Sequence, residues 1–346
     1  MVWTRRKLLR HLRGLLVGGV ACYAFGFKRG PGAEQQGQAA SLDAGPDPPE
    51  PVIDTHQHLW DLSRLRLPWL AGAGKLNRSY LMSDYLEAAA GLGIVKAVYM
   101  EVAVAEEMLV QEAEWVIEIC QQGDSPTVAA VIGGRPAAPD FREYVFRFKD
   151  SPFVKGIRHI LPGDQATLWE SPEFIRGIRL LGQIGWSFDL CLPARLLEQA
   201  IRLVDRCPET RFVLDHCGNG DPVAFMTETR RQTAGVTRPP DHDPEQWKKD
   251  VARLAERKNV ICKISGIVAR APEKTWVSED LAPLVNHCVE VFGAERVIFA
   301  SDWPVCTRVA TLAEWLNALR QIVADRPAAL RRALFSENAI KFYGLA

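Results

Sequence analysis

Residues 297–302 read Val-Ile-Phe-Ala-Ser-Asp, a short apolar run that ends on the carboxylate of Asp302. A run of β-branched and apolar residues without polar alternation predicts a strand buried on both faces, as in a parallel sheet. Similar runs recur from residue 52 onward. Together they predict eight strands, at 52–56, 95–102, 127–132, 154–160, 186–192, 211–216, 260–265 and 297–302.

Amphipathic stretches separate most of these runs. They predict helices at 105–121, 171–184, 193–207, 247–257, 280–292, 312–325 and 327–343. Regular alternation of strand and helix predicts an α/β protein, either a (β/α)8 TIM barrel or a doubly wound open sheet. Barrels often exceed 250 residues as one domain, so we expect a single barrel domain over residues 51–346.

Polar side chains gather at the carboxyl ends of the predicted strands. Since catalytic groups of barrels cluster at this end of several different strands, the pattern favours the barrel over the open sheet. Burying so many polar groups without a use would be costly. The residues concerned are His56, His58, Glu101, Arg158, His159, Asp189, His216, Lys263 and Asp302.

His56-Gln57-His58 is the sharpest local signal among them. Two histidines two residues apart on a strand point to the same face, so both can reach one ion or one substrate oxygen. His216 supplies a third imidazole, and Asp302 supplies a carboxylate. Such a set is a plausible site for zinc or another divalent cation.

The first fifty residues are unlike the rest of the chain. A basic stretch with Arg5 and Arg6 precedes an apolar run that suits a signal-peptide core, and residues 31–50 are rich in Gly, Pro and Ala. We therefore expect residues 1–30 to form a twin-arginine-like export signal or a membrane-anchoring leader, followed by a flexible linker at 31–50. The protein would be periplasmic or membrane-anchored, with a cytoplasmic location as the alternative.

Composition restricts the partners. The chain has 42 basic and 42 acidic residues, which argues against a general nucleic-acid binder, and 47% hydrophobic residues, which excludes overall disorder. Apart from contact between the leader and a membrane, the expected partner is a small molecule. The sequence does not indicate an oligomeric state.

Five blocks in order along the chain resemble the amidohydrolase superfamily: V-I-D-T-H-Q-H-L-W, V-K-G-I-R-H-I-L, V-L-D-H-C-G, V-I-C-K-I-S-G and V-I-F-A-S-D-W-P-V. More narrowly, they resemble its amidohydrolase-related group, which includes sugar lactonases such as L-fuconolactonase and 2-pyrone-4,6-dicarboxylate lactonase. The resemblance implies a barrel hydrolase that opens a sugar-derived or dicarboxylate lactone.

The resemblance also implies roles for individual residues. Asp302 would be the general base for the attacking water. His56, His58 and His216 would bind a metal together with Asp302, or would polarise the substrate carbonyl. The substrate-binding residues would be Arg158, His159, Lys263 and Trp303, to which we add Trp60 as an aromatic wall for a ring. The strand-four end, Arg158-His159, lacks the bridging ligand of binuclear members. One divalent metal, zinc or manganese, and metal-independent catalysis both stay open, and no organic cofactor is expected.

The function of the chain and the role of one long segment both have open alternatives. The chain could be a metal-dependent decarboxylase or hydratase of the same superfamily, or a non-catalytic barrel that binds sugar acids. The long polar segment at 218–246 could be a lid over the site or a solvated insertion.

Overall fold

The structure is a computed structural model that describes residues 50–160 and 163–345. The predicted leader and all but the last residue of the predicted linker lie outside these residues. Within the described ranges, every helix is too short or too polar to cross a membrane.

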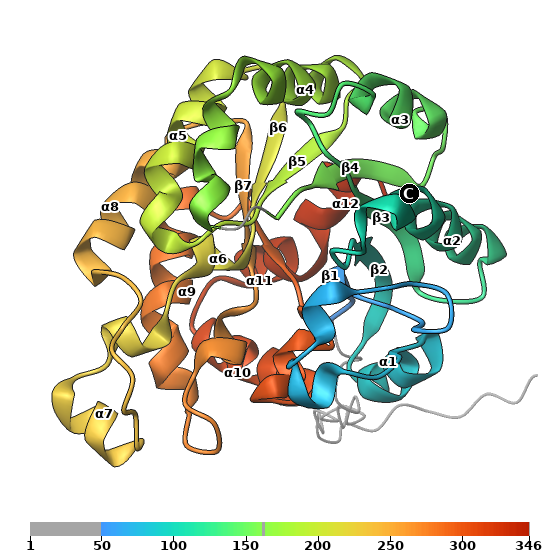
Figure 1. Cartoon of the computed structure of the whole chain (residues 1–346). Coiled ribbons are helices and arrows are strands. Elements are labelled where there is room, and N and C mark those ends of the chain that lie inside the picture. The colour runs from blue at the N-terminus through green and yellow to red at the C-terminus, as the bar shows by residue number, and fades with distance from the viewer. Residues whose placement is uncertain (1–49, 161–162, 346) are drawn as a thin grey trace, which may run out of the picture. The chain divides into compact units, whose positions relative to one another are not determined.

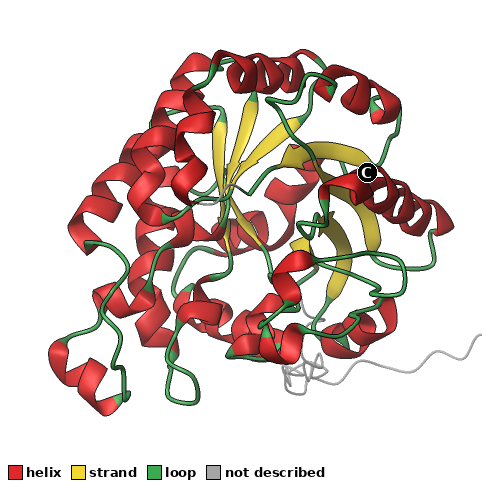
Figure 2. Ribbon diagram, in the orientation of Figure 1, coloured by secondary structure: helices red, strands yellow, loops and turns green. Residues whose placement is uncertain are grey.

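The described chain forms a single (β/α)8 barrel, as predicted (Figures 1 and 2). Eight parallel strands pair in sequence order, which excludes the doubly wound alternative. They are β1 (Val52–Gln57), β2 (Ile94–Met100), β3 (Thr127–Gly133), β4 (Val154–Arg158), β5 (Ser187–Leu190), β6 (Arg211–Leu214), β7 (Val260–Ile264) and β8 (Val297–Phe299).

Contacts between β8 and β1 bring the two ends of the sheet together. The backbone N–H of His58 donates to the carbonyl of Trp303 at 2.8 Å, and Thr55 Oγ1 donates to Phe299 O at 2.7 Å. The buried carboxylate of Asp54 accepts hydrogen bonds from the N–H and the hydroxyl of Ser301, at 2.8 and 2.6 Å. Asp54 therefore holds the end of the barrel together beside the histidines.

Helices surround the strands in Figure 2. The α-helices are α1 (Met82–Ala89), α2 (Leu109–Gln122), α3 (Phe141–Phe148), α4 (Pro172–Gln183), α5 (Leu197–Arg206), α6 (His216–Asn219), α7 (Glu228–Thr233), α8 (Pro244–Ala255), α9 (Ser278–Phe292), α10 (Leu312–Ile322), α11 (Ala328–Arg332) and α12 (Asn338–Tyr343). The predicted helix ranges do not include α1, α3, α6 or α7. A five-residue π-helical segment, η9 (Ala333–Glu337), separates α11 from α12 within the predicted last helix.

Alternate strand residues belong to two apolar clusters. Val98, Val213 and Ile261 belong to the smaller cluster, which also contains Tyr343 and Leu345 from the end of the chain. Their strand neighbours belong to the larger cluster that includes the helices. Since successive residues of a barrel strand face inward and outward in turn, the smaller cluster fills the barrel interior.

The inward positions turn from apolar to charged toward the carboxyl ends of the strands. Asp215 follows Val213 by two residues, and Lys263 follows Ile261 by two residues. With Arg158 and Asp189, they make up the ionic layer, four buried charged side chains that separate the apolar interior from the mouth of the barrel.

The predicted strands at 211–216 and 297–302 extend too far. The observed strands end at Leu214 and Phe299, because His216 and Asp302 have left-handed backbone angles, with φ of 54° and 56°. A strand cannot continue through such a residue. Leaving the sheet here turns both side chains toward the barrel mouth.

The segment at 218–246 contains two short helices, η6 (Pro222–Phe225) and α7. Buried Asp221 accepts two hydrogen bonds from Arg238, both at 2.7 Å, and Arg230 pairs with Asp280 of α9 at 2.6 Å. Figure 1 shows α7 at the outer edge of the molecule, far from the strands. Most of this segment is therefore an ordered insertion beside the barrel, and α7 does not cover its mouth.

Candidate active site

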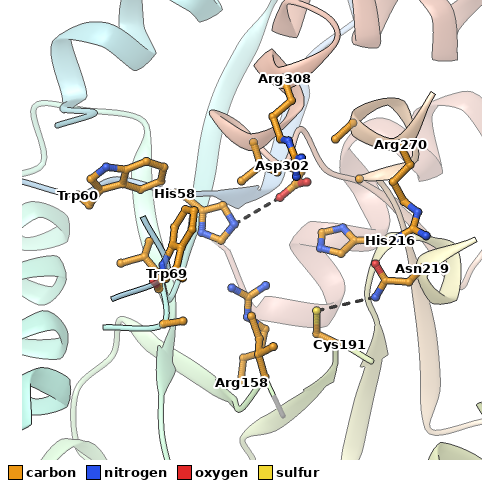
Figure 3. Close-up of a pocket in the computed structure, with 16 residues that line it drawn as sticks. His58, Trp60, Trp69, Arg158, Cys191, His216, Asn219, Arg270, Asp302 and Arg308 are labelled. Atoms are coloured by element: carbon orange, nitrogen blue, oxygen red, sulfur yellow. Dashed lines mark hydrogen bonds and ion pairs between the residues drawn. The ribbon is translucent and has the colours of Figure 1, made fainter. Parts of the chain in front are cut away.

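A cavity of about 400 Å³ lies where the carboxyl ends of the strands meet (Figure 3). Its lining residues come from the carboxyl ends of seven of the eight strands, or from the loops that follow them. They are His58, Trp60, Trp69, Val102, Ala103, Arg158, Ile160, Cys191, His216, Asn219, Gly266, Ala269, Arg270, Asp302, Val305 and Arg308.

Asp302 and His58 face each other in this cavity (Figure 3). His58 Nε2 lies 3.4 Å from Asp302 Oδ1, and both residues are buried. His58 Nδ1 lies 2.9 Å from the carbonyl of Met100, which can only accept, so Nδ1 carries the proton. With Nε2 unprotonated, its lone pair points at the carboxylate, and a proton donor or a cation within reach of both atoms would stabilise the pair. With Nε2 protonated, the two side chains form an ion pair.

His56 lies just below the cavity and is fully buried. Its Nε2 is 3.1 Å from Arg158 Nη1, and its Nδ1 is 3.5 Å from Asp215 Oδ1. Burial and the neighbouring charge of Lys263 lower the pKa of His56 well below its ordinary value. His56 is therefore a neutral imidazole that accepts from Arg158 through Nε2, with the Nδ1 proton toward Asp215.

His216 reaches the cavity from an unusual turn. The four residues His216, Cys217, Gly218 and Asn219 all have left-handed angles, with φ of 54°, 51°, 64° and 52°. Such a conformation costs about 1–2 kcal/mol for each residue other than glycine. The turn places two of its residues, His216 and Asn219, in the cavity wall. Strain of this kind is typical of functional sites.

Two neighbours fix the ring of His216. Ser265 Oγ lies 2.9 Å from Nδ1, which leaves Nε2 for the cavity. Gly266 approaches so closely that a Cβ atom there would lie 2.5 Å from Cγ of the ring. Burial lowers the pKa of His216, so this imidazole is also held in its neutral form.

Arg158 combines a structural contact with exposure to the cavity. Its Nε donates to Glu101 Oε1 at 2.7 Å and its Nη2 to the Glu101 carbonyl at 2.6 Å. The resemblance implies that Arg158 contacts the substrate. The structure shows the ion pair and also places the guanidinium in the cavity lining (Figure 3).

Lys263 does not line the cavity, contrary to the expectation that it binds substrate. It is fully buried in the ionic layer, where Nζ lies 2.6 Å from Asp189 Oδ2 and 3.2 Å from Asp215 Oδ1. Burial raises the pKa of Asp189 to about 7, although Lys263 opposes this shift. Asp215 stays ionised despite its burial, because Lys263 and His56 hold its pKa well below the usual range. The sequence could not show that these two aspartates were the partners of Lys263.

His159 and Trp303 also lie outside the cavity lining. His159 follows Arg158 on the opposite side of the chain and stacks on Phe174, with ring centroids 6.3 Å apart. Burial lowers the pKa of His159 to about 3. Trp303 packs edge-on against Tyr80 and Tyr85, behind Asp302.

Two tryptophans form an aromatic wall. Trp60 and Trp69 both line the cavity and meet edge to face, with centroids 5.6 Å apart. Their indole N–H groups donate to backbone carbonyls, Trp60 to Arg78 O at 2.5 Å and Trp69 to Val102 O at 2.7 Å. The rings are thus held in place beside the space for a substrate.

The residues expected to bind a metal fall into two groups that share His56. One donor atom each from His56, His58 and Asp302 lies within 4.8 Å of the others, and a second group joins His56, Asp215 and His216. The first group offers two imidazoles and one carboxylate, a donor set that suits zinc. To bind through Nε2 of His56, an ion would have to replace the hydrogen bond from Arg158. The four-residue set expected from the sequence is therefore not gathered at one point.

Sequence reasoning missed several cavity residues. Arg270 and Arg308 follow the ends of β7 and β8 by a few residues, as loop residues of a barrel mouth do. Gly266 follows β7 more closely still. The available signal was that each of these residues follows a predicted strand. None of them stands in a polar motif, so the sequence did not mark them as site residues.

Fold and site together define a barrel enzyme whose polar groups meet at the carboxyl ends of the strands. The chain belongs to the amidohydrolase family: the family model described as Amidohydrolase (Amidohydro_2) matches residues 53–345. The protein is thus a hydrolase of the amidohydrolase superfamily.

Individual relatives agree with this assignment. An L-fucono-1,5-lactonase from Burkholderia multivorans is 28% identical, over 85% of this chain and 96% of the relative. An uncharacterised Sinorhizobium fredii protein is 29% identical over 84% of this chain and 98% of its own length. A crystal structure of a Burkholderia multivorans amidohydrolase with bound zinc is 25% identical and superposes with a TM-score of 0.72, over 85% of this chain and 99% of that one.

Proposed function

We propose that this protein is a lactonase that opens a cyclic ester by attack of water. The observation that carries the proposal is the pair of Asp302 and His58, 3.4 Å apart in a buried cavity that also presents His216 and Arg158. Relatives named L-fucono-1,5-lactonase support a lactone as the substrate.

Asp302 and His58 would together bind the attacking water on the cavity side of the pair. The water would donate one hydrogen bond to the carboxylate of Asp302 and the other to Nε2 of His58. As its oxygen attacks the carbonyl carbon of the lactone, Asp302 takes the proton as general base. The fixed geometry of both acceptors supplies orientation that bulk water lacks.

Arg158 and His216 would stabilise the negative charge on the carbonyl oxygen. Both side chains point into the cavity that His58 and Asp302 line (Figure 3). When Ser265 donates to Nδ1 of His216, Nε2 carries a proton and serves as a donor. When the ring C–O bond breaks, the proton on Asp302 passes to the departing alkoxide, which yields a hydroxy acid and restores the carboxylate. Preorganised donors of this kind contribute roughly 3–4 kcal/mol each.

A divalent cation, if the protein uses one, would be held by His56, His58 and Asp302. Bound there, it would act as a Lewis acid and lower the pKa of water. We propose zinc or manganese as the metal, and metal-independent hydrolysis as the alternative. Chelator treatment of the purified protein, followed by metal analysis and re-addition of each ion, separates the two.

The test of the proposed function is an assay on a panel of aldonolactones, with acid release followed by a pH indicator and the hydroxy acid identified by NMR. Turnover of a lactone to its acid is the expected result. Release of carbon dioxide from aromatic acids, or hydration without acid release, would contradict it and favour the decarboxylase or hydratase alternative. Two decarboxylases share the fold at 14% identity, which is a likeness of fold alone. Binding of sugar acids without turnover of any lactone would favour the non-catalytic barrel.

A further inference from the structure

Among the residues that the structure describes, the cavity wall carries three guanidinium groups and a single carboxylate. Arg158, Arg270 and Arg308 line it together with Asp302 (Figure 3). Three cations around one site exceed what water attack on a neutral ring requires. Their partners show which of them is available to a substrate.

Two of the three arginines already have partners within the protein. Arg158 is paired with Glu101, and Arg270 is paired with Asp241. Arg308 makes no hydrogen bond or ion pair with any residue in the parts of the chain that the structure describes, including Asp302 in the same cavity. Its charge is therefore not neutralised by the residues around it.

The degree of burial shows that Arg308 lies at the cavity entrance, whereas Asp302 and Arg158 lie at its floor. Asp302 and Arg158 are 4% and 3% exposed, whereas Arg308 is an exposed residue. The backbone that carries Arg308 is ordered: η8 (Val305–Arg308) begins directly beyond Asp302, and Cys306 N donates to Asp302 O at 2.8 Å. The backbone of Arg308 thus lies at a fixed offset from the general base, and its side chain is free to reach a ligand at the entrance.

We propose that the substrate is a lactone that carries a free carboxylate, and that Arg308 binds this carboxylate at the cavity entrance. The inference rests on the proposed function. A guanidinium presents paired donors that match the two oxygens of a carboxylate. With the carboxylate at Arg308 and the ring beside Trp69, the lactone carbonyl would extend toward His216 and Asp302. Positive charge at the entrance would also speed the capture of an anion.

Three matched pairs of sugar lactones test the inference: the 1,4-lactones of glucarate and gluconate, galactarate and galactonate, and mannarate and mannonate. Within a pair, the two compounds differ only at C6, which is a carboxylate in the first and a CH2OH group in the second. We expect kcat/KM to be at least ~10-fold higher for the acidic member, since a hydrogen bond to a charged group contributes about 1.5–3 kcal/mol. The preference should decrease as salt rises.

Arg308→Met should reduce this preference for the acidic lactone ~10-fold or more, and Arg308→Lys should retain part of it. Arg64→Met is the matched control, because Arg64 is exposed, lies outside the cavity and pairs with Asp61. It should leave the preference unchanged. Calorimetric binding of glucarate and gluconate gives a readout independent of turnover: wild type should bind glucarate more tightly, and Arg308→Met should remove the difference.

The outcomes separate the inference from the proposed function. If neutral lactones are hydrolysed as fast as the acidic ones, or if Arg308→Met keeps the preference, the inference is overturned and the lactonase proposal stands. If no lactone is hydrolysed but glucarate still binds in an Arg308-dependent manner, the lactonase proposal fails while the anion site is supported. If neither turnover nor preferential binding is found, both fail.

Discussion

Gly266 determines where the ring of His216 can lie. It has a left-handed φ of 67°, and a Cβ atom added there would come within 2.5 Å of that ring. Glycine is therefore required at position 266 for two reasons: its backbone angle is left-handed, and the His216 ring leaves no room for a Cβ atom. Of the described residues, His216 and His58 alone bring imidazoles to the lining, so a small displacement of His216 changes the chemistry of the cavity.

Gly266→Ala should lower kcat/KM at least ~10-fold, equivalent to about 1.4 kcal/mol of transition-state stabilisation, because the ring must move to admit the methyl group. Gly235→Ala is the matched control. Gly235 has a similar φ of 69°, but open space surrounds the position of its Cβ. Steady-state kinetics and thermal unfolding of both variants check the prediction. Equal activity losses would mean that backbone strain, and not the position of His216, is responsible.

At the scale of elements, α2 contacts β2 through a buried acid. Glu112 Oε1 accepts from Tyr99 Oη at 2.9 Å and from Val102 N at 2.7 Å, while Oε2 has no hydrogen-bond partner among the described residues. Burial, together with the charge of Glu101, raises the pKa of Glu112 from 4.5 to about 8. A proton on Oε2 is consistent with this arrangement.

Glu112 should make the protein less stable as pH rises. Above pH 4.5 the unfolded chain releases a proton that the folded protein retains up to about pH 8, so the free energy of unfolding falls within this window and levels off beyond it. The slope contributed by one group is at most about 1.4 kcal/mol per pH unit. Asp189 adds a similar trend, since its pKa is also raised.

Glu112→Gln isolates the contribution of this one acid. Urea unfolding between pH 5 and 8 should show a shallower decline for Glu112→Gln than for wild type, whereas Glu114→Gln, a change on the exposed side of α2, should match wild type. Parallel curves for all three proteins would refute a protonated Glu112 at neutral pH.

The sequence predicted the barrel because buried parallel strands appear as short, continuous runs of apolar and β-branched residues. It did not predict where the strands end. The left-handed angles of His216 and Asp302 occur at residues that carry a Cβ, and no local pattern marks them. It also could not assign partners within the ionic layer, because Lys263 meets Asp189 across strands 74 residues apart in sequence. Register across the barrel, and not local composition, sets that contact.

At the scale of the whole molecule, the barrel divides into an apolar interior, the ionic layer and the cavity. Burial and Lys263 keep His56 neutral, Asp215 faces its Nδ1, and His56 in turn contacts Arg158 at the cavity floor. Chemistry at the mouth thus depends on two charged residues, Lys263 and Asp215, that do not line the cavity. The net charge of zero conceals this internal arrangement and the basic start of the chain.

The full chain should be exported through its basic leader. Replacing both Arg5 and Arg6 by lysine should retain the protein in the cytoplasm of a bacterium competent for twin-arginine export, because the paired arginines are the recognised feature of such signals. Cell fractionation and immunoblotting measure the distribution. Lys7→Arg keeps the positive charge and serves as the control. Unchanged export of the double variant would contradict a twin-arginine signal.

In the proposed reaction, Asp302 activates the water that opens the ring. Asp302→Asn keeps the size of the side chain but removes the base, so kcat on the best lactone of the panel should fall at least ~100-fold, within the range attributed to general-base catalysis. Asp124→Asn, a change of the same kind at an exposed position, should leave kcat unchanged. Circular dichroism and thermal unfolding should show that Asp302→Asn is folded. A folded Asp302→Asn protein that retains the wild-type kcat would contradict the account.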